Sequence, residues 1–391
     1  MNVVYFGNTL NRHQVYVADA LYDLTDGNYV YVETVPPRKE NLSGGKAKSE
    51  RPYVFRAYEG VDAKLKALRI AREADIVLFG AESLEYEVER MRTTAGLAFE
   101  VSERWLKRGW LNLLSPRLLK NMWYYHTLFK NKPLYKLCSS AFGAGDQYRL
   151  HSFRDKCYKW GYFTKVDEIN IEEVINNRQK VEASSSVSTS RSVTILWCAR
   201  FLKLKHPELV VKLAQRLKEK GYSVQIDMYG AGAELESTKL LCQNLGVEEM
   251  VVFKGSVPNA EIIIAMQKHD IFLFTSDRNE GWGAVLNEAM SNGCTVVASN
   301  EIGSVPYLIE DGKNGQIFKS KDLDSLCKRV IYLIDNPVRR KEMAVKAYST
   351  MKDNWSPQRA AENFLRLAEE LLAGNKGSIL IGPCSKALPI F

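Results

Sequence analysis

Short apolar runs and helical patterns alternate along most of this chain. The runs are four to eight residues long, which is typical of buried strands, and Gly or polar loops follow them. Repeated strand–helix alternation predicts an α/β fold with parallel sheets. The predicted strands cover residues 2–6, 29–35, 75–80, 97–101, 134–141, 156–163, 193–198, 224–228, 271–274 and 295–298.

Two strand–loop–helix units follow each other directly between residues 271 and 306. The first strand ends in a polar loop that closes with Glu280-Gly281-Trp282-Gly283, and a helix is predicted over 284–292. In an open parallel sheet the ligand crevice lies beyond the carboxyl ends of the strands, and glycines there let backbone N–H groups approach an anion. This stretch therefore predicts a diphosphate site.

Charged residues around this stretch fit a nucleotide sugar. Glu280 and Glu288 have E-x7-E spacing, and their carboxylates can accept hydrogen bonds from sugar hydroxyls beside the phosphates. Arg200 and Lys205 lie five residues apart after the strand at 193–198, where both can reach one diphosphate. The alternative for Glu280 and Glu288 is a surface acid pair beside a helix cap. The alternative for Arg200 and Lys205 is two solvated surface cations.

Residues 272–318 resemble the donor-site signature of retaining glycosyltransferases of family 4, as in bacterial capsular and exopolysaccharide synthesis. The resemblance implies the GT-B fold: two Rossmann-like parallel-sheet domains facing across a cleft, with a C-terminal helix returning to the first domain. It also implies roles for individual residues. Glu280 with Gly281, Trp282 and Gly283 would hold the transferred sugar, and Glu288 would hold the ribose of the nucleotide.

The resemblance extends to positions outside this segment. Arg200 and Lys205 keep the family's spacing, although Ala199 and His206 stand where the family usually has glycine. The other donor-side candidates are Gly7, which matches a first-domain glycine beside the diphosphate, Gly230, in a tight turn near the donor, and Val257, in the loop against the base.

The acceptor side departs from the family pattern. Relatives usually place a His, or in some branches a carboxylate, after the strand that corresponds to 97–101. This chain has Ser102-Glu103-Arg104 there, so Glu103 and Arg104 become the acceptor-side candidates. His13, at the start of the first predicted helix, is a third candidate, and its alternative is a helix-capping or solvated residue.

The domain organisation follows from these assignments. Residues 1–165 are expected to form an acceptor-binding Rossmann-like domain, and 193–355 a nucleotide-sugar-binding domain. The segment 166–192 between them is expected to be a linker, because its 183–190 stretch is Ser-rich with little to bury. A closing helix at 356–373 and a tail at 374–391 complete the expected order.

Composition indicates the cellular compartment of the protein and whether it needs a cofactor. No apolar run approaches the ~20 residues of a membrane span, and the first residues lack a signal-peptide layout, so we expect a cytoplasmic protein. Seven cysteines form no C-x-x-C pair, which indicates free thiols in a reducing compartment. Five histidines show no metal-ligand spacing, and the D-x-D at 322–324 heads a helix. No metal or other cofactor is expected.

Positive charge is concentrated in the first domain. Residues 1–165 contain 26 Lys and Arg against 18 Asp and Glu, whereas the remainder has 28 of each. The segment 100–136 mixes eight basic residues with tryptophans and leucines. This pattern is typical of a peripheral contact with the anionic inner face of a membrane. The alternative is a pair of core-facing helices with a solvated basic face.

The sequence thus predicts a retaining hexosyltransferase that moves a sugar from a nucleoside diphosphate sugar to a saccharide acceptor. A UDP-sugar is favoured over a GDP-sugar, and the acceptor is expected to be lipid-linked, in surface polysaccharide synthesis, with no nucleic-acid partner. Two alternatives stay open: a GT-B epimerase or phosphorylase, and a non-catalytic nucleotide-sugar or membrane-binding module. A dehydrogenase is disfavoured, because no G-x-G-x-x-G follows the first strand.

Overall fold

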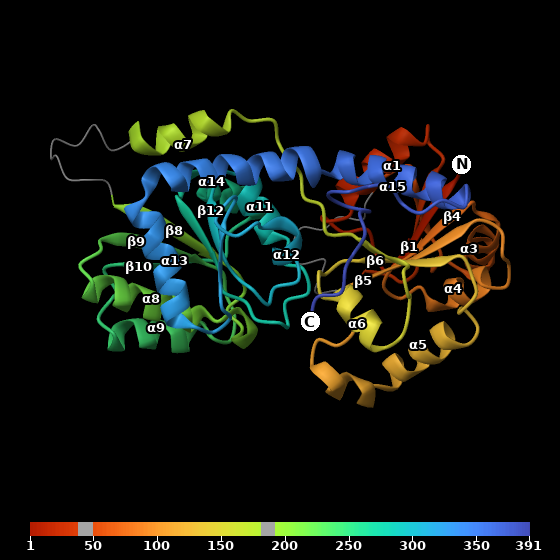
Figure 1. Ribbon diagram of the computed structural model, residues 1–391, viewed down its shortest axis with the longest axis horizontal. Helices are drawn as coiled ribbons and strands as arrows, with labels where there is room; N and C mark the ends of the chain where they lie inside the picture. The colour runs from red at the N-terminus through yellow and green to blue at the C-terminus, as the bar shows by residue number, and fades with distance from the viewer. Residues whose placement is uncertain (38–49, 181–191) are drawn as a thin grey trace. The chain divides into compact units, whose positions relative to one another are not determined.

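A computed structural model describes residues 1–37, 50–180 and 192–391. The chain forms two compact units: unit 1 comprises 1–164 and 354–391, and unit 2 comprises 165–353. Each unit is a parallel sheet with helices packed on it (Figure 1). The predicted α/β fold with two parallel-sheet domains is therefore confirmed. The Ser-rich stretch 183–190 lies outside the described residues.

In its described part, unit 1 has a seven-stranded sheet of order β3-β2-β1-β4-β5-β6-β7, and all its strand pairs are parallel. From β1, the strands β2 and β3 are added on one side and β4 to β7 on the other. The direction in which the chain adds strands therefore reverses between β1 and β4. Such a switch point leaves a crevice at the carboxyl ends of the two strands. The strands are β1 (Val3–Gly7), β2 (Tyr29–Glu33), β3 (Val54–Arg56), β4 (Ile76–Phe79), β5 (Leu97–Ser102), β6 (Leu134–Cys138) and β7 (Cys157–Lys159).

The helices of unit 1 cover this sheet with apolar side chains. Phe6 on β1 stacks on Phe79 of β4 and on Tyr86, with ring centroids 5.6 and 4.8 Å apart. The helical segments are α1 (Val15–Leu24), α3 (Val61–Glu73), α4 (Leu84–Arg90), η1 (Gly109–Leu114), α5 (Pro116–His126), α6 (Gly143–Arg149) and α15 (Pro357–Leu372).

Helix α15 packs against α1 and β5 of unit 1, as the expected closing helix would. Its Phe364 meets the ring of Phe99 edge-on, with centroids 5.2 Å apart. Ser356 caps the helix by accepting a hydrogen bond from the Arg359 N–H, and Pro357 occupies the first turn. These local signals explain why the helix starts where the sequence pattern placed it.

The segment expected to be a tail is packed on unit 1. Cys384 N–H donates to the Lys159 carbonyl, and Lys159 N–H donates to the Ser385 carbonyl, 2.7 and 2.8 Å apart. An antiparallel bridge joins Tyr158 to Lys386. Residues after α15 thus satisfy the edge of β7, which would otherwise present unpaired backbone groups.

In the described part of unit 2, a six-stranded parallel sheet has the order β10-β9-β8-β11-β12-β13, with its switch point between β8 and β11. Residues 171–180 of the expected linker form helix α7. The strands are β8 (Val193–Cys198), β9 (Val224–Tyr229), β10 (Val251–Gly255), β11 (Ile271–Phe274), β12 (Thr295–Ser299) and β13 (Gln316–Phe318).

The largest core cluster of unit 2 lies on one face of its sheet, where alternate strand residues such as Ile195, Ile226 and Leu273 are buried. Asp322 caps α13 by accepting from the Ser325 N–H at 2.9 Å, so the D-x-D acid has a structural role. The helical segments are α7 (Ile171–Lys180), η2 (Lys203–Lys205), α8 (Pro207–Glu219), α9 (Leu235–Asn244), α10 (Asn259–Lys268), α11 (Val285–Ser291), α12 (Val305–Leu308), α13 (Leu323–Asp335), α14 (Pro337–Ser349) and the π-helical turn η3 (Thr350–Asn354).

None of the described helices is long and apolar enough to cross a bilayer. Within the same residues, no group of three or more His, Cys, Asp or Glu side chains is arranged to hold a metal ion.

Candidate functional site

The switch point of unit 2 brings together two of the predicted catalytic residues. Strands β8 and β11 are neighbours, so the loops at their carboxyl ends meet. There the Lys205 ammonium forms an ion pair with the Glu280 carboxylate, and Ser276 Oγ donates to the same oxygen of Glu280 at 3.0 Å. The Lys205 and Glu280 side chains are 13% and 14% exposed. The pair is therefore within reach of a ligand yet shielded from bulk water.

Backbone bonds fix the two loops relative to each other. Thr275 Oγ1 donates to the Lys205 carbonyl at 2.6 Å, and the Asp277 N–H donates to the Leu204 carbonyl at 2.9 Å. Trp197 Nε1, from the buried strand β8, donates in turn to Thr275 Oγ1 at 2.9 Å. The position of Lys205 is thus tied directly to the core of the sheet.

His206 adds a further clamp beside Lys205. Its Nδ1 lies 2.7 Å from Glu208 Oε1, and its Nε2 lies 3.2 Å from Asp277 Oδ2. The hydrogen bond with Glu208 raises the pKa of His206, and the bond with Asp277 raises it further against the opposing effect of burial. Burial alone would raise the pKa of Asp277, but hydrogen bonds from the Asn279 amide, His206 and Lys321 outweigh it and lower that pKa.

The Gly281–Trp282–Gly283 turn shapes the same edge. The Trp282 ring is fully buried, and its Nε1 donates to Asn287 Oδ1 at 2.9 Å. Gly283 has φ +81°, and a Cβ there would come within 2.2 Å of the Phe274 ring. Trp282 is therefore a core residue of the turn.

The remaining donor-side candidates lie on separate elements of unit 2. Arg200 follows β8, is exposed, and makes no ion pair with any residue that the structure describes. Gly230 presses its turn against that loop, because a Cβ would lie 1.9 Å from the Ala199 carbonyl oxygen. Glu288 is buried on α11, and Val257 is half-buried after β10. Strand β10 (Val251–Gly255) ends two residues before Val257.

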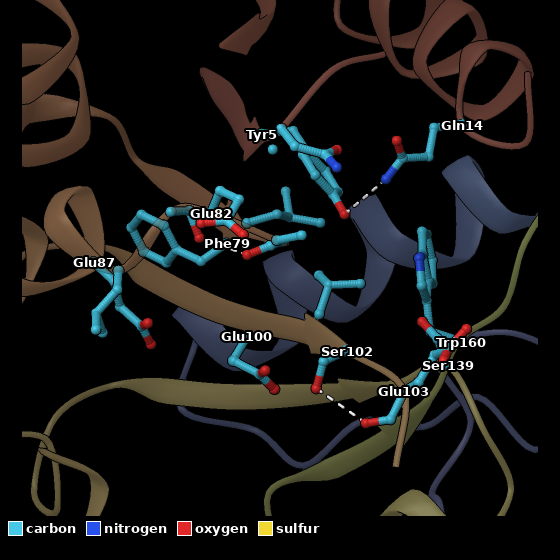
Figure 2. A pocket seen from close by; sticks show the side chains of 18 of the residues that line it. Tyr5, Gln14, Phe79, Glu82, Glu87, Glu100, Ser102, Glu103, Ser139 and Trp160 are labelled. Atoms are coloured by element: carbon cyan, nitrogen blue, oxygen red, sulfur yellow. Dashed lines mark hydrogen bonds between the residues drawn. The ribbon is translucent and has the colours of Figure 1, made fainter. Parts of the chain in front are cut away.

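Unit 1 contains a cavity of about 1030 Å³ at its own switch point. It lies at the carboxyl ends of β1, β4 and β5, and Figure 2 shows the hydrogen bonds of Gln14 with Tyr5 and of Ser102 with the Glu103 carbonyl among its lining residues. Four predicted residues line it: Gly7, His13, Glu103 and Arg104. Ser102 and Gln14, beside the predicted residues in sequence, also line it. Sequence reasoning missed the others that give it its chemistry, namely Tyr5, Glu82, Glu87, Glu100, Ser139 and Trp160.

Gly7 makes room for a pair of aromatic rings. Tyr5 and Tyr31 stack with centroids 5.1 Å apart, and a Cβ on Gly7 would lie 2.3 Å from Tyr31 Oη. Gln14 joins the two hydroxyls, since its Nε2 donates to Tyr5 Oη at 3.2 Å and its Oε1 accepts from Tyr31 Oη at 3.1 Å. Burial raises the pKa of both tyrosines, so each keeps its proton at neutral pH.

The three acceptor-side candidates have different surroundings. His13 stacks on Tyr162, with centroids 5.9 Å apart, and Tyr162 Oη donates to Glu103 Oε1 at 2.8 Å. Glu103 also pairs with Lys107. Arg104, in contrast, is buried against Asp146, 3.0 Å between Nη2 and Oδ1, so its guanidinium has a structural partner. The structure therefore groups His13 with Glu103 and sets the Arg104 charge apart.

A buried charged network forms part of the cavity lining. Lys136 forms an ion pair with Glu100 and donates to Ser102 Oγ at 2.8 Å, and Tyr125 Oη donates to Glu87 Oε1 at 2.9 Å. Burial raises the pKa of Glu87 from 4.5 to about 8, helped by the charge of Glu100 and opposed by Tyr125 and Lys136. A Glu inside the apolar run 97–102 and a Lys inside the run 134–138 were the sequence signals for this network.

Comparison with known proteins agrees with the geometry of unit 2. Residues 179–350 match the family described as "Glycosyl transferases group 1". This part of the chain is a group 1 glycosyltransferase domain. The full chain resembles solved structures of the GT-B fold: Anabaena Alr3699/HepE in complex with UDP (TM-score 0.67, 15% identity, 96% of this chain and 100% of that one) and the apo lipopolysaccharide outer core galactosyltransferase WaaB (TM-score 0.69, 14% identity, 95% and 100%).

Curated relatives match over part of their length. The GDP-mannose-dependent alpha-(1-6)-phosphatidylinositol monomannoside mannosyltransferase of Mycolicibacterium smegmatis is 28% identical over 188 residues, 46% of this chain and 48% of that protein. The poly(ribitol-phosphate) alpha-N-acetylglucosaminyltransferase of Staphylococcus aureus is 23% identical over 43% of this chain and 34% of that protein. The chain thus spans half or less of the length of these relatives.

Proposed function

We propose that this protein is a retaining glycosyltransferase that transfers a sugar from a nucleoside diphosphate sugar to a saccharide acceptor. The observation that carries the proposal is the Lys205–Glu280 pair at the β8/β11 switch point of a group 1 glycosyltransferase domain. A cation and a carboxylate at that place fit the two halves of such a donor, since one binds phosphate oxygens and the other sugar hydroxyls.

Lys205 would act on the leaving diphosphate. Negative charge grows on that group as the sugar–phosphate bond breaks, and a positioned cation with low exposure stabilises it. Exposed Arg200, five residues before Lys205, would add a bidentate contact to the same diphosphate. The backbone and side-chain bonds that hold the Lys205 loop would keep this cation in place during the reaction.

Glu280 would orient the transferred sugar. The ion pair with Lys205 balances two charges that are largely shielded from water, and the donor would replace each partner with its own complementary groups. Glu288 would hold the ribose. The departing phosphate would itself accept the acceptor's proton, so the retaining reaction needs no separate general base.

A UDP-sugar is the favoured donor in this proposal, and the saccharide acceptor would bind in the unit 1 cavity. UDP is supported by the fold likeness to a structure that holds UDP, while the mannosyltransferase relative is described as GDP-mannose-dependent. The cavity offers carboxylates, hydroxyls and an amide, the groups that hydrogen-bond sugar hydroxyls. The relative named as a phosphatidylinositol monomannoside mannosyltransferase supports a lipid-linked acceptor, and the one named for poly(ribitol-phosphate) supports a role in surface polysaccharide synthesis.

Turnover of donor sugars by a Lys205→Ala variant tests this proposal. Release of UDP or GDP from their common sugars is measured for the wild type and for Lys205→Ala, with and without oligosaccharide acceptors. The variant should be slower by a factor of about ten to a thousand, because one stabilising cation is removed from the transition state.

Lys203→Ala is the matched control, since Lys203 is an exposed lysine in the same η2 turn. It should leave turnover nearly unchanged. Equal rates for the wild type and Lys205→Ala would contradict the assigned role of Lys205. Absence of sugar release from every donor would contradict the transferase proposal as a whole.

A further inference from the structure

Unit 1 exposes a cluster of large apolar side chains on η1, α5 and the turn after α5, here called the η1–α5 surface. Trp110, Leu114 and Trp123 are 60%, 79% and 56% exposed. Exposed apolar groups of this size and density mark an interaction site more often than a solvated surface. The other apolar members are Leu111, Leu119 and Leu128.

Helix α5 carries this cluster in addition to its own core face. Leu118 and Tyr125, seven residues apart, are buried against unit 1. Leu119 and Trp123, four residues apart, are more than half exposed, so a second apolar stripe faces away from the core. A helix that only covered a core would be polar on that side. Figure 1 shows α5 at the periphery of unit 1.

The same surface is cationic. The sequence holds no Asp or Glu between residues 104 and 145. Arg108, Lys120 and Lys130 are exposed and form no ion pair with any residue in the described part of the chain. Arg117 has Glu82 4.0 Å away. Positive charge at the apolar cluster is therefore left for an external partner.

The η1–α5 surface is continuous with the wall of the unit 1 cavity. From these same elements the cavity is lined by five polar residues, Asn112, Ser115, Arg117, Lys120 and Asn121, and by Pro116 and Leu118, whereas Trp110, Leu114 and Trp123 do not line it. The two elements thus offer polar groups to the cavity and apolar groups to the outside. A partner that binds the exposed apolar side chains of η1 and α5 therefore lies next to the cavity.

We propose that the η1–α5 surface docks on an anionic lipid bilayer. Tryptophans settle at the headgroup level and leucines reach the acyl boundary, while the surrounding cations meet anionic headgroups. A nucleic acid would satisfy the cations but leave the leucines in water. Given the proposed function, on which this second step rests, the docked protein takes an acceptor saccharide carried by a lipid of the same bilayer.

Vesicle binding by the full chain tests the docking. Sedimentation is measured with vesicles of phosphatidylcholine alone and with added phosphatidylglycerol. The wild type should bind the anionic vesicles far more tightly, and added salt should weaken the binding. A double variant, Trp110→Ser with Leu114→Ser, should lower vesicle affinity at least about tenfold, because two interfacial apolar anchors are lost. Arg108→Glu with Lys130→Glu should lower it by a similar factor.

Matched controls lie on unit 2, where the same chemistry is changed on another surface. Leu240→Ser with Val338→Ser removes two exposed apolar side chains, and Lys268→Glu reverses an exposed cation. These controls should bind vesicles like the wild type. Failure of the wild type to bind anionic vesicles, or equal losses in controls and test variants, would overturn the proposal. Binding to a labelled oligonucleotide that persists in the Trp110/Leu114 variant would also overturn it.

Two measurements separate this inference from the proposed function. Lys205→Ala should lose turnover and keep vesicle binding. The Trp110/Leu114 variant should keep its turnover of donor sugar with a water-soluble acceptor and lose vesicle binding. If the wild type transfers sugar but does not bind vesicles, only the docking proposal is contradicted. If it binds vesicles but releases no sugar from any donor, only the proposed function is contradicted.

Discussion

Lys205 and Glu280 are 75 residues apart in the sequence and meet because β8 and β11 are adjacent. Each charge has limited access to water, so removing one partner leaves the other poorly compensated. Thr275, Ser276 and Asp277 hold the two loops through their side chains and backbone. The fold of unit 2 therefore holds the Lys205–Glu280 pair in a fixed place.

The turn beside the site requires glycine at position 283, because a side chain there has no room. Gly283→Ala should lower the free energy of unfolding by about 2–4 kcal/mol, since it combines the strain of φ +81° with a Cβ that would lie only 2.2 Å from the Phe274 ring. Urea unfolding of the purified variant measures the change.

Gly312→Ala separates the two causes, because Gly312 has φ +77° with open space around its Cα. It should lose only about 1 kcal/mol, the cost of the backbone conformation. Equal losses in both variants would contradict the close contact between Gly283 and Phe274.

At the residue scale, sequence reasoning identified positions better than environments. The Lys205 and Glu280 positions followed from strand ends and spacing, and the structure places them in contact. Trp282 and Arg104 also lie beside predicted loops, yet the ring of one is buried and the guanidinium of the other is paired with Asp146. Side-chain direction depends on packing partners that are distant in sequence.

At the element scale, α4, β5, α5 and β6 contribute to one polar network at the wall of the unit 1 cavity. Glu87 on α4, Glu100 on β5 and Tyr125 on α5 lie in this network with Lys136 of β6. A low-dielectric surrounding makes such a network sensitive to the protonation of any member.

Glu87→Gln should change how stability depends on pH. The pKa of Glu87 is raised from 4.5 to about 8, so the folded protein keeps a proton that the unfolded chain releases. The free energy of unfolding from this group therefore falls as pH rises from about 4.5 to 8. Gln keeps the acceptor for Tyr125 without ionising, and the variant should gain roughly 1–4 kcal/mol over the wild type between pH 5 and 8.

Urea unfolding at several pH values measures this difference. Glu85→Gln is the control, because Glu85 lies on the same helix but is exposed and paired with Lys64 at the surface. Its difference from the wild type should stay nearly constant over the same range. A Glu87→Gln profile parallel to the wild type would contradict a proton held on Glu87.

Elements with a strong local period were predictable, and those defined by pairing were not. Buried parallel strands and the capped helix α15 carry their signals in their own residues. Residues 374–391 carry no such signal, because their order comes from pairing with β7. The ion pair of Glu100 with Lys136 depends likewise on the parallel register of β5 and β6.

At the scale of the whole molecule, both units place polar groups at a topological switch point. In unit 1, later strands are added on both sides of β1, and in unit 2 they are added on both sides of β8. Strand–helix alternation was sufficient to predict two parallel sheets, but strand order is fixed by tertiary packing and could not be predicted from alternation. The excess positive charge of residues 1–165 belongs to unit 1, the unit that carries the η1–α5 surface.

The central claim is that unit 2 binds a nucleoside diphosphate through Lys205. Thermal unfolding of the full chain with UDP, GDP and ADP, alone and as their common sugars, measures it directly, because a ligand of the folded state raises the midpoint. We predict a higher midpoint with UDP and its sugars for the wild type and for Lys203→Ala, and little or no shift for Lys205→Ala. No shift with any nucleotide, or the same shift in Lys205→Ala, would contradict the account.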